Sequence, residues 1–123
     1  MSSIFLFIAS IYGALSVAIG AFGAHALDAR LEQIGKKEHF ITASRYQFYH
    51  VFALLIVGLL MRSVESKALV YSGWAFTIGI PIFCGTLYAI ALTGKTGFGA
   101  IAPIGGLLFI LGWVFLAVGT LKI

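Results

Sequence analysis

Four long apolar stretches occupy this chain and restrict its possible folds more than any other feature. They cover approximately residues 4–24, 45–61, 68–92 and 98–121. A helix needs about 20 mostly apolar residues to cross a hydrocarbon layer about 30 Å thick, because each residue adds about 1.5 Å. The stretches are continuous, whereas strands of a membrane barrel alternate apolar and polar residues. We therefore predict an all-α fold, an integral membrane four-helix bundle that forms a single transmembrane domain over residues 1–123.

The four predicted spans leave little chain outside the bilayer. Only 10% of the residues are charged, against roughly 25% in an average soluble domain. No segment is long enough for a soluble catalytic domain, so any function must lie in the bundle or in the loop at 26–44. The Lys and Arg residues behind the net charge of +4 are scattered over loops and ends. We therefore expect the lipid bilayer as the partner, and no nucleic acid.

The loop at 26–44 is the longest connection between two spans. Leu27, Leu31 and Ile34 fall on one face of a helix, which indicates a short amphipathic segment lying in the membrane interface and ending near Gly35. An ordinary solvated connector explains the composition equally well. We expect the helix of the second span to begin before the bilayer, near Lys37.

Small residues mark the expected helix contacts. In the first span, Gly13 and Gly20 share a seam with Ser16 and Gly23, and a second seam runs through Ala14, Ala18, Ala21 and His25. Small residues let helix backbones approach closely in lipid. The two seams predict that the first span is the central helix, packed against two neighbours.

Two features stand out in the third and fourth spans. Pro81 lies near the middle of the third span, where it predicts a kink facing the bundle interior. In the last span, Gly105, Gly112 and Gly119 recur every seven residues. This flat stripe is suited to helix contact within the bundle or between protomers, and we expect the protein to form a homo-oligomer.

Polar side chains gather on one side of the predicted topology, where the loops at 26–44 and 93–97 lie. The predicted intramembrane polar cluster consists of His25, Tyr46, Gln47, Tyr49, His50 and Tyr88. Tyr46, Gln47 and His50 can share one helix face. The topology places the cluster in one leaflet, with His50 as the leading candidate for function and His25 as its neighbour.

Three interpretations of this cluster compete. The first is an interhelical hydrogen-bond network, which we favour. The second is a passage for a proton, an ion or a small ligand that uses His25 and His50. The third is metal or haem ligation by His25, His50 and Cys84, but no tight ligand spacing supports it, so we predict no metal and no cofactor.

An enzyme is not expected, because the acidic residues lie in loops, away from any nucleophile or base in the spans. These residues are Asp28, Glu32, Glu38 and Glu65.

Basic residues favour one orientation of the protein in the membrane. Five Lys or Arg residues flank the loops at 26–44 and 93–97, and three lie on the side of the termini, so the positive-inside rule predicts cytoplasmic loops and external termini.

Four motifs carry a resemblance to a known family. They are Gly20-Ala21-Phe22-Gly23-Ala24-His25, Tyr46-Gln47-Phe48-Tyr49-His50, Gly85-Thr86-Leu87-Tyr88, and the run from Gly99 to Gly106 with Gly112-Trp113. In this order they resemble the small four-span bacterial inner-membrane proteins of the YgdD/YwdK type, a domain of unknown function. The resemblance covers essentially the whole chain and implies the fold and an inner-membrane location, but no reaction.

These observations give two hypotheses for function. The first is a structural or accessory membrane protein whose polar cluster stabilises the bundle or contacts a membrane-protein partner. The alternative is a minimal proton, ion or small-molecule carrier or channel that uses His25 and His50.

Overall fold

The computed structural model describes all 123 residues, and the fold is all-α with no strand. Four helices are long and apolar enough to cross a membrane. The elements in chain order are α1 (Ser2–Ala24), α2 (Asp28–Ile34), α3 (Lys37–Leu60), α4 (Lys67–Thr93), the short 3-10 helix η1 (Thr96–Ala100) and α5 (Ala102–Thr120). The long helices agree with the four predicted spans, and α3 begins at Lys37, outside the most apolar part of its sequence.

The short helix α2 lies where the amphipathic pattern predicts it. Gly35 ends α2 in the left-handed conformation with a φ of 80°, a conformation that suits glycine because it has no Cβ. Leu31 is buried against Phe40 and Ala91, while Asp28 pairs with Lys37 at the start of α3. Apolar packing and one ion pair therefore hold α2 against the end of the bundle.

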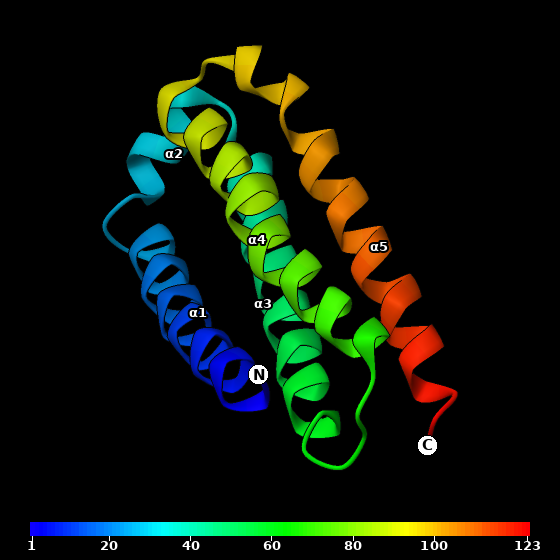
Figure 1. The fold of residues 1–123 in the computed structure, drawn as a ribbon. Coiled ribbons are helices and arrows are strands. Elements are labelled where there is room, and N and C mark those ends of the chain that lie inside the picture. Colours follow the sequence, from blue (N-terminus) through cyan, green and yellow to red (C-terminus); the bar gives the residue numbers. More distant parts are fainter.

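The long helices form an open bundle in which α3 and α4 are central. Helix α1 packs mainly on α3, and α5 packs on α4, so α1 and α5 lie on opposite sides (Figure 1). The prediction that the first span is the central helix is wrong. Its glycine seam packs against a single helix, because Gly13 faces Val51 and Gly20 faces Ser44, both on α3. The alanine seam at Ala14, Ala18 and Ala21 is exposed.

The glycine stripe of α5 meets a matching stripe on α4. Gly105 faces Phe83, Gly112 faces Phe76 and Gly119 faces Leu69. Both rows advance by seven residues, in opposite chain directions, which is the repeat of two helices packed with a left-handed twist. A Cβ at Gly105 would lie 2.5 Å from the backbone nitrogen of Phe83. The stripe is therefore used inside the bundle, between α4 and α5.

Pro81 does not face the interior. Its side chain is exposed, and α4 continues through it as one helix. The prediction of an inward-facing kink is wrong, because residues on either side of Pro81, such as Ile80 and Cys84, occupy the buried face instead.

Candidate functional site

A hydrogen bond from another helix compensates the backbone group that Pro81 leaves free. Proline has no N–H, so the carbonyl of Thr77, four residues earlier in α4, lacks its helical donor. The hydroxyl of Tyr12 on α1 donates to this carbonyl at 2.8 Å. A free carbonyl in the hydrocarbon region costs free energy, so Tyr12 stabilises α4 and fixes α1 against it.

Gln47 connects this bond to the rest of the bundle. Its side-chain nitrogen donates to the backbone carbonyl of Tyr12 at 3.3 Å, and its side-chain oxygen accepts from the hydroxyl of Tyr88 at 2.6 Å. Gln47 is only 4% exposed. A continuous network, which we name the Tyr12–Gln47–Tyr88 network, therefore joins α1, α3 and α4.

His50 lies on α3 one turn beyond Gln47 and bonds in a different direction. Its Nδ1 lies 2.7 Å from the carbonyl of Tyr46, and its Nε2 lies 3.1 Å from the indole nitrogen of Trp113 on α5. Because a carbonyl only accepts and an indole N–H only donates, the proton is on Nδ1 and Nε2 accepts. These contacts use both nitrogens of a neutral imidazole.

Aromatic stacking fixes the plane of the His50 ring. The ring lies parallel to that of Phe109 on α5, with 3.6 Å between the centroids and 8° between the planes. Tyr46 stacks on Phe83 at 5.0 Å. These rings continue into a surface groove between α3 and α5 with a volume of about 800 Å³. We name it the α3–α5 groove, and its lining includes Tyr46, Tyr49, His50, Gly106, Phe109 and Trp113.

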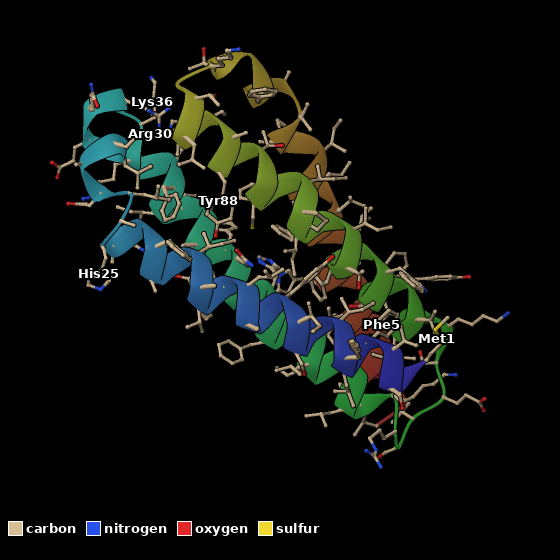
Figure 2. The ribbon with its side chains drawn as sticks, turned by 90° about the vertical axis from the view of Figure 1, so that its left-hand side faces the viewer. Met1, Phe5, His25, Arg30, Lys36 and Tyr88 are labelled. Atoms are coloured by element: carbon tan, nitrogen blue, oxygen red, sulfur yellow. The ribbon has the colours of Figure 1, made fainter.

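The structure does not bring His25 to these residues. His25 is exposed at the end of α1 and points away from the bundle, whereas Tyr88 lies inside it (Figure 2). The register of α1 on α3 explains this, because Gly13 meets Val51 and Gly20 meets Ser44. Continued to the end of α1, that register places His25 level with His39, roughly 16 Å along the helix from His50.

The polar network lies near the middle of the long helices. Tyr12, Gln47 and Thr77 are all near the middle of their helices. The expectation that the predicted cluster occupies one leaflet stays a prediction. Helix α3 begins at Lys37, as expected, so Gln47 and His50 lie near its centre.

Sequence reasoning missed three participants: Tyr12, Phe109 and Trp113. Tyr12 could have been found by asking which donor reaches the carbonyl four residues before Pro81. The other two carry no comparable signal, because an aromatic residue in an apolar helix is usually a lipid-facing or core side chain. No three His, Cys, Asp or Glu residues lie close enough to hold a metal ion, so His25, His50 and Cys84 do not form a ligand set.

Comparison with known proteins gives the family. A family model described as a protein of unknown function (DUF423) matches residues 19–106. The UPF0382 membrane protein of Staphylococcus epidermidis is 40% identical over 123 residues, covering 97% of this chain and 96% of the relative. The UPF0382 membrane protein YwdK of Bacillus subtilis is 32% identical, covering 97% of each chain.

No solved structure shows a significant match. Neither the family description nor the names of these relatives states an enzymatic activity. The relatives are bacterial membrane proteins, and this chain has four helices able to span a membrane. The resemblance seen in the motifs is thereby confirmed: the chain belongs to the DUF423 family and is a multi-pass protein of the bacterial inner, or plasma, membrane.

Proposed function

We propose that the protein is a non-enzymatic structural or accessory bundle of the plasma membrane, and that its central polar residues serve to hold the helices together. One observation carries the proposal: the polar side chains of Tyr12, Gln47, His50 and Tyr88 all bond to partners within the chain. Satisfied polar groups inside a membrane bundle stabilise one arrangement of its helices.

The same geometry argues against a carrier or channel that uses His25 and His50. A proton path needs titratable groups within hydrogen-bond reach, directly or through water. Gln47 does not titrate, and His50 bonds towards α5 while Gln47 bonds towards α1 and α4. His25 lies at the surface. These contacts favour a fixed network over a path.

A flux experiment separates the two functions. The wild-type protein and the His50→Ala variant are reconstituted in liposomes loaded with a pH-sensitive dye, with His25→Ala as the matched control. A structural role predicts no proton flux above that of protein-free liposomes for any of the three, and lower stability for His50→Ala alone. A wild-type flux that disappears in a folded His50→Ala variant would refute the structural role.

We further propose that the protein self-associates through α1. The exposed seam of Ala14, Ala18 and Ala21 offers a close-approach surface on a helix that packs mainly on one neighbour. In membranes, Ala18→Cys is expected to form disulfide-linked dimers under oxidation, whereas Val114→Cys on the exposed face of α5 should not. Equal crosslinking of both variants, or of neither, would contradict this interface, and a different membrane protein on the seam would then be the next candidate.

A further inference from the structure

The α3–α5 groove has the composition of a ligand site, and its open volume has no role in the proposed structural function. Its volume of about 800 Å³ falls within the range of roughly 300–1,000 Å³ typical of small-molecule sites. Seven of its ten lining residues are hydrophobic, and none is Lys, Arg, Asp or Glu. A phosphate or another charged headgroup therefore finds no counter-charge there.

The floor of the groove is preorganised. His50 is held by Tyr46 on one side and Trp113 on the other, and its ring lies flat on Phe109. The backbone of α5 is fixed against α4 where Gly105 meets Phe83. His50 and Phe109 are buried, and the hydrogen bond to His50 holds Trp113, which stays 46% exposed in the groove. A flat ring can pack on this fixed indole with little reordering of the protein.

The groove also contains unpaired hydrogen-bond donors. The side chains of Tyr46 and Tyr49 are 39% and 56% exposed, and neither hydroxyl takes part in any side-chain hydrogen bond of the chain, in contrast to those of Tyr12 and Tyr88. Both residues lie within the predicted span at 45–61, and an unpaired hydroxyl in contact with hydrocarbon costs free energy. An acceptor oxygen on a bound molecule would satisfy them.

These features together specify the ligand. The ligand is uncharged, it reaches the groove laterally from the bilayer, and it has a flat ring that carries acceptor oxygens. We propose that the α3–α5 groove binds a quinone-type lipid, with the ring against the exposed part of the Trp113 indole and its carbonyl oxygens accepting from the hydroxyls of Tyr46 and Tyr49. This binding role goes beyond the structural function and does not depend on it.

Tryptophan fluorescence provides the test, since quinones quench indole emission and the chain has two tryptophans. Trp113 lines the groove, whereas Trp74 packs against Phe5 of α1 and does not line it. Decyl-ubiquinone is titrated into two single-tryptophan variants in nanodiscs, Trp74→Phe and Trp113→Phe. The proposal predicts saturable quenching of Trp113 and only weak, linear quenching of Trp74. Linear quenching of equal slope at both sites would overturn it.

A substitution at Gly106 places a side chain in the groove without a clash at its Cβ. A Cβ at Gly106 would lie 3.8 Å from the ring of Phe83, an ordinary contact, and Gly106 lines the groove. Gly106→Leu should abolish saturable quenching of Trp113. Gly85→Leu on the exposed face of α4, where a Cβ meets nothing within 4 Å, is the matched control and should leave it unchanged. Saturation that survives Gly106→Leu would overturn the site.

The hydroxyls are tested separately. Tyr46→Phe with Tyr49→Phe keeps the rings and removes only the donors, so the affinity for decyl-ubiquinone should fall by about 4- to 100-fold, one hydrogen bond being equivalent to roughly 2- to 10-fold. Unchanged affinity would overturn the assignment of the hydroxyls. If a second copy of the chain fills the groove instead, Gly106→Leu will dissociate an oligomer and no variant will show saturable quenching, which also refutes the proposal.

Discussion

The hydroxyl of Tyr12 donates to the carbonyl of Thr77, the one backbone acceptor in α4 that Pro81 deprives of its helical donor. Through this bond, α1 supplies the hydrogen-bond donor that α4 lacks at Pro81. A peripheral helix, which shares few other contacts with α4, is thereby fixed in position by the backbone chemistry of a proline. This relationship gives the first prediction.

Tyr12→Phe should lower the free energy of unfolding in detergent by about 1–2 kcal/mol, because it leaves the carbonyl of Thr77 without a donor. In a Pro81→Ala background the helical N–H is restored, so the same substitution should cost less than about 0.5 kcal/mol, within the usual error of additivity. Tyr71→Phe, at an exposed tyrosine outside the network, is the control. Equal costs of Tyr12→Phe in both backgrounds would show that the bond does not compensate Pro81.

Gln47→Leu should destabilise the bundle by about 1–3 kcal/mol, since the buried hydroxyl of Tyr88 loses its acceptor. Adding Tyr88→Phe to Gln47→Leu should recover part of this loss, because no unpaired hydroxyl then remains. Unfolding in sodium dodecyl sulfate, followed by circular dichroism, measures Gln47→Leu, Tyr88→Phe and the double variant. Strict additivity of the two single costs would mean that the residues act independently.

Gly112→Ala should cost about 1–3 kcal/mol through overpacking, because the added Cβ would lie 2.5 Å from the ring of Phe76. The control, Gly85→Ala, meets open space and should be neutral or stabilising by up to about 1 kcal/mol through helix propensity. Thermal denaturation of the two proteins in the same detergent compares them. A similar effect at both sites would contradict the close approach of α4 and α5.

We predict the orientation from the charges on the two sides of the membrane. Ser63→Cys and Thr96→Cys place single exposed thiols on opposite ends of the bundle, while the native Cys84 is buried. A membrane-impermeant maleimide added to intact cells should label Ser63→Cys and spare Thr96→Cys until the membrane is opened, as the positive-inside rule predicts. The reverse pattern would place the loop at 26–44 outside the cell.

The amino-acid sequence by itself determined the elements. Apolar run length sets the four spans, because the bilayer fixes how many residues a helix needs. The left-handed conformation at Gly35 ends α2 where the apolar pattern stops. The repeat of Gly105, Gly112 and Gly119 marks a contact face from the sequence alone, since only close approach of another helix makes use of such a stripe.

Only the tertiary structure decided which partners those faces meet. The α5 stripe fits α4 because Phe83, Phe76 and Leu69 repeat with the same spacing, a relationship between two helices that neither sequence segment contains. His25 and His50 look like neighbours from topology, but the register set by Gly13 and Gly20 on α3 separates them. The same register of α1 on α3 brings the backbone carbonyl of Tyr12 within hydrogen-bond distance of Gln47. Side-chain volumes across an interface fix the register, and the register decides which polar groups come within hydrogen-bond distance.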